Sequence, residues 1–487
     1  MSLERAKELE AAGQGPAAAA AYQAAACELP PAGAQAARLR AGLLLLADGQ
    51  VPAGLEVLAS VLEGVGEKLP SGGLADMAGA LARMAWVRLG GVGAVQRAAD
   101  DVPIADALRA DALWGATLAL YPIDPVLSLA TGTRYQRAAK RAADAARIGR
   151  ALSLEAWFRA TASADSPADD LLDEAAELAR SSEDAYLAGL VPYMRGTLRY
   201  LDGRWREGQR DYELGAACFA EIPGALIEQT STRALGALCR LQRGDLAGAR
   251  QGAESLLAEA RARGDVFSEF LLDATLRWFL FLCDDTPQRG EEVLASIARW
   301  DEGVGRSAHF SLWSRLNTSA SVALYRGQVA QAWEIQEAEW PALARSIFMR
   351  IRFAAHEAHF LRGRAALANA ELAEASERRP FTRVAASMAR RLSRAPEASA
   401  RAWGAVLKAG LHRLAGEAAH ARSADLEACA SFEQLDMQLH GWAARWRLAE
   451  NDAKRQAAEA ALSARGVSAP GRLCALLSGS PPAPEAT

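Results

Sequence analysis

The densest pattern of apolar positions in the sequence lies between residues 309 and 366. In its first part, apolar side chains recur every three or four residues, which places them on one face of a helix. Gly327 follows, and a glycine can end a helix because it adopts left-handed backbone angles without a Cβ clash. The segment therefore predicts an amphipathic helix with one apolar face, formed by Phe310, Trp313, Leu316, Ala320 and Leu324.

Two more apolar stripes follow with almost no loop between them. One spans residues 329–340, and the other spans residues 343–365. Pro341 suits the first position of the third helix, where its missing N–H group would have no partner in any case. Helices joined by such short turns are expected to lie antiparallel to one another and to bury their stripes against their neighbours.

A helix-ending turn recurs along the chain at a nearly constant interval. The spacing is 41 residues, then 41, then 42, which suits a pair of helices slightly longer than a tetratricopeptide unit. Asn369, another 42 residues on, is expected to be a degenerate member of the series. The expected turns centre on Gly13, Gly49, Gly203, Gly244, Asp285, Gly327, Asn369 and Gly416.

The composition agrees with an all-α protein. Alanine, the best helix former, is abundant, and runs of β-branched residues are nearly absent. We therefore expect an all-α fold, a superhelical array of tetratricopeptide-like helical hairpins, that is, an α-solenoid. The expected organisation is N-terminal helical repeats over residues 1–66, a main array over residues 67–478, and a disordered, proline-rich tail over residues 479–487.

Charge and cysteine usage narrow the classes of function. A net charge of −4 argues against binding to nucleic acid or to a membrane surface, and the apolar runs are too short to span a bilayer. The first residues lack the apolar core of a secretion signal. The six cysteines are scattered and form no CxxC pair, which favours reduced, buried thiols and a cytoplasmic location.

Sequence motifs for catalysis are missing or incomplete. The glycines of residues 90–95 follow a helical pattern instead of a strand, and no GK[ST] follows them, so they predict a loop. His356, Glu357 and His359 fall one residue short of HExxH and are expected to lie on a solvated polar face. No GxSxG, HRD or DFG motif occurs. We expect no catalytic, cofactor-binding or metal-binding residue.

Two sets of residues are candidate binding surfaces. Trp313, Trp333 and Trp340 could form an aromatic cage, but their helical spacing favours core packing. Residues 341–400 hold eleven arginines and five acidic residues, which predicts either a solvated helix face or a site for an acidic partner. In the second case, Arg345 and Arg352 would share one face of the third helix. The candidate partner-binding residues are Arg345, Arg350, Arg352, Arg362 and Arg364.

Several segments, in their order along the chain, carry a family resemblance. They are residues 67–70 (EKLP), 82–91 (ARMAWVRLGG), 111–116 (DALWGA), 200–205 (YLDGRW), 264–285, 324–368 and 464–470. In them the sequence resembles the C-terminal helical region of large bacterial serine/threonine protein kinases, of the kind seen in myxobacteria, that also carry an AAA-type ATPase module. The resemblance covers most of residues 1–478.

The resemblance implies a tetratricopeptide-like sensor or docking arm that binds a protein or peptide partner, such as a kinase or ATPase module. Those two modules are absent from these 487 residues, so no catalytic residue carries over. We therefore expect a non-enzymatic interaction protein. Two alternatives stay open: the chain is the C-terminal part of an active serine/threonine kinase whose catalytic domain lies upstream, or it is a repeat-containing transcription regulator, which would need a helix-turn-helix.

Overall fold

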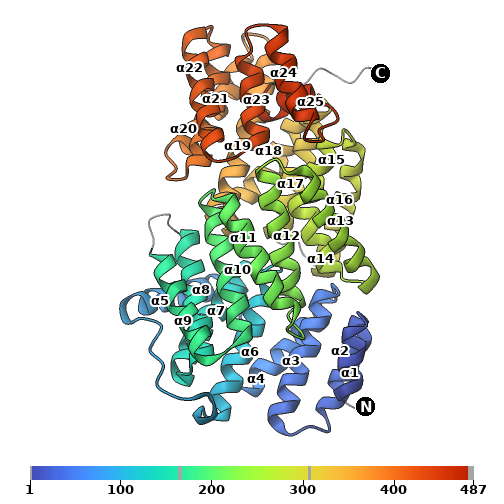
Figure 1. Ribbon diagram of the computed structural model, residues 1–487, viewed down its shortest axis with the longest axis vertical. Coiled ribbons are helices and arrows are strands. Elements are labelled where there is room, and N and C mark those ends of the chain that lie inside the picture. The colour runs from blue at the N-terminus through green and yellow to red at the C-terminus, as the bar shows by residue number, and fades with distance from the viewer. Residues whose placement is uncertain (1–2, 163–166, 305–308, 481–487) are drawn as a thin grey trace.

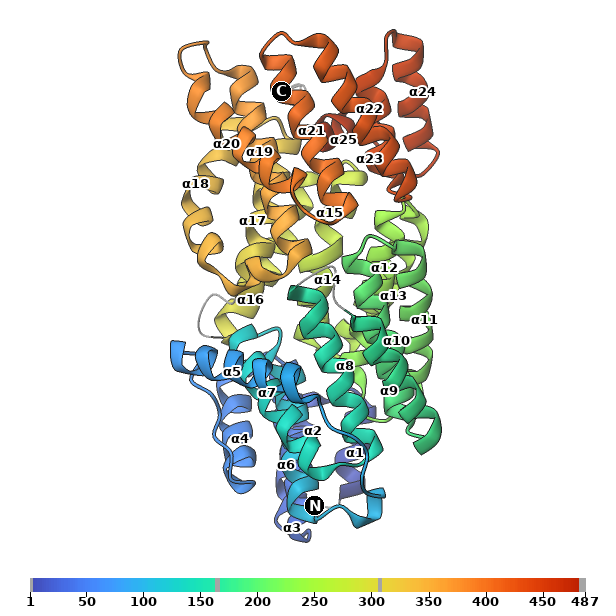
Figure 2. The same ribbon diagram turned by 90° about the vertical axis from the view of Figure 1, so that its left-hand side faces the viewer.

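The computed structural model of the protein consists mainly of helical hairpins of the predicted kind (Figure 1). It describes residues 3–162, 167–304 and 309–480. Within these ranges the chain forms helices and no strand, so the predicted all-α fold is confirmed. The N-terminal helices lie at one end of the long axis and the C-terminal helices at the other (Figure 2). Among the described helices, none combines the length and the apolar character that crossing a membrane requires.

Most helices of the N-terminal part pack against their neighbours in sequence, but α5 packs against α7, and α3 also contacts α6 and α14. A linker over residues 65–73 separates α4 from α5, next to the predicted domain boundary, and the boundary itself stays a prediction. The helices of this part are α1 (Leu3–Ala11), α2 (Gly15–Ala26), α3 (Pro31–Ala47), α4 (Val51–Gly64), α5 (Leu74–Gly90), η1 (Ala99–Asp101), α6 (Ile104–Leu120), α7 (Pro125–Ala142), α8 (Ala145–Ala162) and α9 (Ala168–Ser182).

The remaining helices form successive hairpins, and a short C-terminal helix, α25, packs back against α15 and α17. They are α10 (Ala185–Leu201), α11 (Trp205–Ala220), α12 (Leu226–Gln242), α13 (Leu246–Arg263), α14 (Val266–Leu272), the π turn η2 (Asp273–Arg277), α15 (Trp278–Cys283), η3 (Pro287–Arg289), α16 (Gly290–Val304), α17 (His309–Tyr325), α18 (Val329–Arg345), η4 (Ile347–Arg350), α19 (Arg352–Leu372), α20 (Arg378–Ser393), α21 (Ala398–Leu414), α22 (Ala418–Gln434), α23 (Gln438–Leu448), α24 (Asp452–Ser463) and α25 (Pro470–Ser478).

The turns predicted by the 41-residue spacing lie between paired helices. Gly244 joins α12 to α13 with φ +77°, and its N–H donates to the carbonyl oxygen of Leu241 at 2.9 Å. Asp285 takes the equivalent place after α15 with φ +55°, a conformation in which aspartate is tolerated better than most residues. Gly13, Gly49, Gly203, Gly327 and Gly416 also have positive φ, so these turns are confirmed.

Two predicted boundaries are wrong. Asn369 is not a turn but lies inside α19, where its amide donates to the carbonyl oxygens of Val329 at 3.0 Å and Ala365 at 2.9 Å. The predicted third helix over residues 343–365 is divided, because Pro341 lies within α18 and the chain leaves helical geometry at Ser346. The Ser346 hydroxyl accepts a hydrogen bond from the N–H of Phe348 at 3.1 Å, which begins η4 instead.

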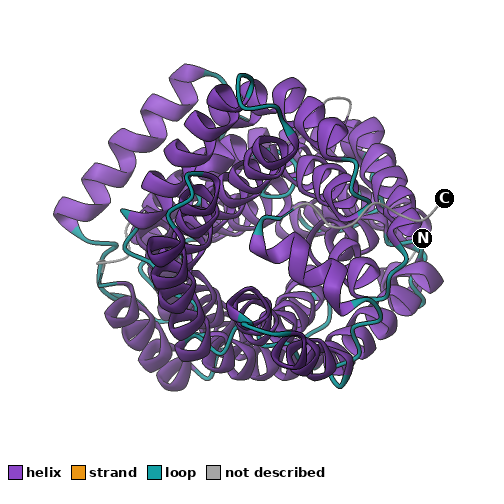
Figure 3. Ribbon diagram, turned by 90° about the horizontal axis from the view of Figure 1, so that it is seen from above, coloured by secondary structure: helices purple, strands orange, loops and turns teal. Residues whose placement is uncertain are grey.

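The hairpins wind around a common axis, and the view along that axis shows the helices as a ring (Figure 3). Segments far apart in sequence meet where one turn of the superhelix lies on the next. The Arg243 side chain contacts Asp436, and the Arg352 Nε donates to the carbonyl oxygen of Ala160 at 2.8 Å. Ser468 N–H donates to the Cys283 carbonyl oxygen at 2.8 Å, which holds the segment before α25 against the end of α15. The superhelix is therefore closed by contacts between its turns.

Candidate functional site

A cavity of about 310 Å³ lies among the first helices of successive hairpins. Its wall is built mainly from α6, α8, α10, α12, α14, α15, α17, α19, α21, α23 and α25, which come from nearly the whole length of the chain. The second helices of the hairpins contribute almost nothing to it, because they form the outer layer. This volume is at the lower end of the range of about 300–1,000 Å³ that is typical of small-molecule sites.

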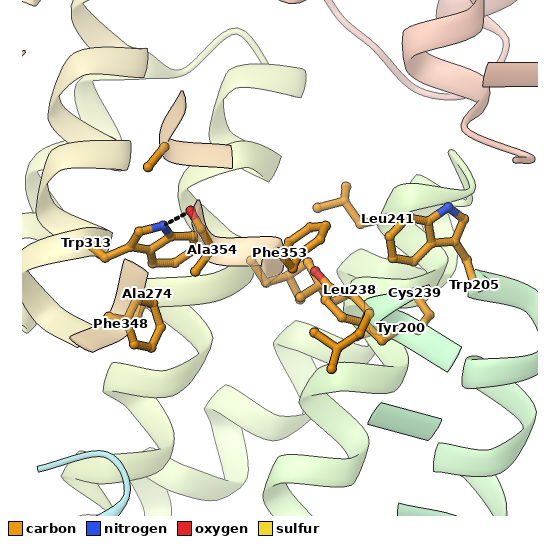
Figure 4. Close-up of a cluster of buried hydrophobic side chains, with 14 of the residues drawn as sticks. Tyr200, Trp205, Leu238, Cys239, Leu241, Ala274, Trp313, Phe348, Phe353 and Ala354 are labelled. Atoms are coloured by element: carbon orange, nitrogen blue, oxygen red, sulfur yellow. Dashed lines mark hydrogen bonds between the residues drawn. The ribbon is translucent and has the colours of Figure 1, made fainter. Parts of the chain in front are cut away.

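Aromatic side chains form much of the wall. The Phe353 ring lies 4.7 Å from that of Tyr200 and 6.0 Å from that of Trp205, in edge-to-face geometry. Trp313 stands on the other side of Phe353, and its Nε1 donates to the carbonyl oxygen of Ala354 at 3.1 Å (Figure 4). The faces of such rings suit a flat or aliphatic ligand, because burying apolar surface supplies most of the binding free energy.

One end of the cavity carries Glu357, Arg364 and His440. Glu357 and Arg364 are seven residues apart on α19 and alternate with Phe353 and Phe360 at helical spacing. The Arg364 guanidinium lies over the Phe360 ring, with 4.5 Å between Cζ and the ring centroid, and Nη1 donates to the carbonyl oxygen of Leu476 at 3.1 Å. The two residues of α19 therefore place a carboxyl group and a cation in one aromatic wall.

Burial sets the ionisation of this group of residues. It raises the pKa of Glu357 to about 8, against the opposing effect of the Arg364 charge, so the carboxyl group is mostly protonated at neutral pH. Burial also lowers the pKa of His440 to about 3, with a smaller contribution from Arg364, and the imidazole is neutral. Burial lowers the pKa of Arg364 to about 10, which leaves its guanidinium charged. At pH 7 this end of the cavity is therefore cationic.

Glu228 also belongs to the wall, and its carboxyl group already accepts a hydrogen bond within the chain. The Tyr186 hydroxyl donates to Glu228 Oε1 at 2.6 Å and accepts from Trp114 Nε1 at 3.0 Å. Burial raises the pKa of Glu228, while the Tyr186 hydrogen bond and the positive charges of Arg40 and Arg150 oppose the rise. This chain of buried hydrogen bonds connects α6, α10 and α12, and its role is structural.

Several other polar atoms of the wall have no partner in the chain. Within the described residues, no hydrogen bond is made by the Nε1 atoms of Trp278 and Trp403, the Oγ atom of Ser321 or the Nε atom of Arg364, although all four atoms are buried. Buried donors are nearly always hydrogen-bonded in folded proteins. These four atoms are covered by neighbouring side chains, so the wall that a bound molecule would meet is mainly apolar.

The structure does not bring the five predicted arginines together on one outward face. Arg345 ends α18 and Arg350 ends η4, and both are exposed. Arg352 is largely buried and contacts the carboxylate of Glu397, so the expectation that Arg345 and Arg352 share one face of a single helix is wrong. The reason is the break at residues 346–351. That exposed arginines bind a partner stays a prediction.

The remaining two arginines of that set point into the molecule. Arg362 contacts Glu337 at 2.7 Å, with its Cζ 5.2 Å from the Trp333 ring and 4.7 Å from the Trp340 ring. Arg364 lines the cavity. The three tryptophans considered as a cage are thus separated: Trp333 and Trp340 flank Arg362, and Trp313 lies in the core and lines the cavity.

The polar face predicted around His356 is also not solvated. Glu357 lines the cavity, and His356 Nε2 lies 3.7 Å from Glu397 Oε2. The His359 ring lies 5.8 Å from that of Trp340, and burial lowers its pKa to about 4, helped by the Arg391 charge. The alternation of Phe353, Glu357, Phe360 and Arg364 was the sequence signal for an inward face with charges.

Among the described residues, one group has side chains close enough to share a metal ion: His412, Glu417 and His420. They lie at the turn between α21 and α22. His412 Nδ1 is 2.6 Å from Glu417 Oε2, and His420 Nδ1 is 3.6 Å from the same oxygen. The group is half to largely exposed, and a pair of imidazoles around one carboxylate accounts for its geometry without a metal.

Comparison with known proteins adds no relative: no family model matches the chain, and no curated protein matches it. The class of protein is defined by its fold alone. It is an α-solenoid of consecutive helical hairpins whose inner helices surround a cavity.

Proposed function

We propose that this protein is a non-enzymatic helical-repeat module that binds a small molecule in its axial cavity and a protein partner on its outer surface. This matches the sensor or docking arm of the bacterial kinase–ATPase proteins that the sequence resembles. The cavity carries the proposal, because it has the size and the aromatic wall of a small-molecule site. A cytoplasmic location, with a kinase or ATPase module as partner, belongs to the same proposal.

The position of the cavity suits a sensor. Its wall combines residues that are far apart in sequence, from Thr117 of α6 to Leu477 of α25, so a bound molecule would contact side chains from several hairpins at once. A ligand that contacts two parts of a chain favours the arrangement in which both contacts are made. Occupancy would therefore change how firmly the turns of the superhelix hold together, and a partner bound outside would detect that change.

A neutral fluorescent probe, N-phenyl-1-naphthylamine, tests the cavity directly. We expect its fluorescence to rise on binding to the wild type and this rise to be lost in Leu235→Trp and Thr275→Trp. Both residues line the cavity and are half-buried, so a larger side chain can grow into the open volume. Leu214→Trp is the matched control, because Leu214 is 57% exposed on α11.

Circular dichroism and thermal melting establish that each variant is folded. The proposal is wrong if the wild type does not bind the probe, or if both folded cavity variants bind it as well as Leu214→Trp does. The non-enzymatic part has its own test: the purified protein should hydrolyse no ATP.

A further inference from the structure

The charged end of the cavity indicates which ligands it takes, and this inference rests on the function proposed above. Arg364 is 8% exposed, yet no carboxylate of the described residues lies within 4 Å of its guanidinium. Its contacts are the Leu476 carbonyl oxygen at 3.1 Å and the face of Phe360, and its buried Nε has no partner in the described chain. A buried cation without an anion is costly, and an anion brought by a ligand would relieve that cost.

The neighbouring residues do not supply the missing charge. Glu357 is mostly protonated at neutral pH because burial raises its pKa to about 8. The Glu228 carboxylate is hydrogen-bonded to Tyr186. His440 is neutral, and its ring lies 6.0 Å from that of Trp403 and 5.1 Å from that of Phe432.

We propose that the cavity binds a compact hydrophobic monocarboxylate, with its carboxylate on the Arg364 guanidinium and its apolar body along Phe353, Phe360 and Trp403. A carboxylate accepts N–H hydrogen bonds from a guanidinium, and within the described residues Nη1 of Arg364 donates to Leu476 whereas Nη2 has no partner, so Nη2 can donate to a ligand. Protonated Glu357 can donate to the same ligand. The stacked rings of Phe360 and Trp403, 5.4 Å apart with planes at 10°, continue the apolar wall beside the cation.

Competition against N-phenyl-1-naphthylamine measures the preference for charge. We expect decanoate to bind at least about tenfold more tightly than 1-decanol, because a charge-assisted hydrogen bond is added to the same apolar body. Decylammonium should bind more weakly than either. A comparison with 3-phenylpropanoate distinguishes an aliphatic from an aromatic acid, both of which belong to the proposed class.

Substitution of the arginine locates the carboxylate. Arg364→Met should bring decanoate to the affinity of 1-decanol and leave probe binding unchanged, whereas Arg364→Lys should keep part of the preference. Arg350→Met, at an exposed arginine, should behave as wild type. Glu357→Gln keeps a hydrogen-bond donor and should retain the preference for decanoate, which serves as the second test if Arg364→Met does not fold.

The outcomes separate this inference from the proposed function. If the wild type binds the probe but binds decanoate no better than 1-decanol, the carboxylate assignment is wrong and the cavity function stands. Tighter binding of decylammonium would mean that Glu357 carries the relevant charge. A preference for decanoate that persists in folded Arg364→Met would place the carboxylate elsewhere. If the wild type does not bind the probe, both the proposed function and this inference are wrong.

Discussion

Arg243 and Asp436 lie 193 residues apart in sequence, and the Arg243 Nε donates to Asp436 Oδ2 at 2.9 Å. Arg206 donates to the same oxygen at 2.9 Å, so two arginines of one superhelical turn meet a single aspartate of another. Asp436 stands in the turn between α22 and α23 with φ +57°. The two turns of the superhelix are therefore joined by specific polar contacts as well as by packing.

The first prediction concerns this junction. Asp436→Asn tolerates the left-handed backbone but removes the charge that both arginines contact, and we expect it to lower the free energy of unfolding by about 1 kcal/mol. Arg243→Gln should cost more than Arg206→Gln, because Arg206 is the more exposed partner. Urea unfolding measures the free energy of unfolding of all three variants. If none of the three differs from wild type, the contact contributes nothing to stability.

The same aspartate gives a prediction for acid. Burial raises the pKa of Asp436, but hydrogen bonds from Gln438, Arg243 and Arg206 outweigh burial and lower it. A carboxyl group with a lowered pKa in the folded state stabilises the fold above its unfolded pKa, and this contribution is lost as the pH falls through the folded value. The difference in stability between wild type and Asp436→Asn should therefore shrink below about pH 4, as urea unfolding at several pH values would show.

For Glu357 we expect the opposite dependence of the free energy of unfolding on pH. Its pKa is raised to about 8 in the folded protein, so between the unfolded value and pH 8 the folded state retains a proton that the unfolded state has lost. Stability should then fall as the pH rises through this window, by at most about 1.4 kcal/mol per pH unit. Glu357→Gln cannot ionise, and its stability relative to wild type should increase from pH 5 to pH 8. A constant difference would mean that Glu357 is ionised in the cavity.

Substitutions at two glycines can distinguish the effect of backbone strain on stability from the effect of close contact between turns of the superhelix. Gly244 has φ +77°, and a Cβ there would lie 2.8 Å from the Cβ of Gln438. Gly416 has φ +76°, with nothing within 4 Å of the same position. Gly416→Ala should cost about 1 kcal/mol from the backbone alone, and Gly244→Ala should cost clearly more, in the range of roughly 1–3 kcal/mol. Similar melting temperatures for the two variants would contradict the close approach at Gly244.

The arginine segment gives a further prediction. Arg352→Glu would set a carboxylate against Glu397 and near Asp202, so we expect a loss of about 3 kcal/mol, as for other broken buried ion pairs. Arg345→Glu changes an exposed side chain and should leave the melting temperature nearly unaltered. If a protein partner uses this region, Arg345 and Arg350 are the residues whose reversal should weaken its capture, most strongly at low salt.

Local patterns in the sequence were sufficient for the hairpins but not for the way they assemble. The turns at Gly203, Gly244 and Gly327 could be predicted, because the positive φ at the end of a helix favours glycine. The turn predicted at Asn369 was wrong. The Asn369 side-chain amide donates a hydrogen bond to a neighbouring helix, and the spacing of residues along the sequence does not reveal such a contact. The predicted third helix is interrupted at Ser346, where the backbone becomes extended and the hydroxyl accepts a hydrogen bond from the Phe348 N–H.

The cavity was harder to predict for the same reason. Helical spacing placed Glu357 and Arg364 on one face of α19, but it did not show that this face points inward. That outcome depends on Trp403 and His440, which come from hairpins further along the chain and complete the wall. The burial that shifts the pKa of Glu357 is therefore a property of the assembled superhelix and of no single helix.

The contact between Arg243 and Asp436 also has a consequence for synthesis on the ribosome. At about 5–20 residues per second, Asp436 is made roughly 10–40 s after Arg243. During that interval the junction between the two turns is missing, and for the first part of it, until Phe353 is made, the Tyr200 and Trp205 rings lack the cover that Phe353 provides. The burial of these rings therefore depends on residues that are made well after the helices that carry them.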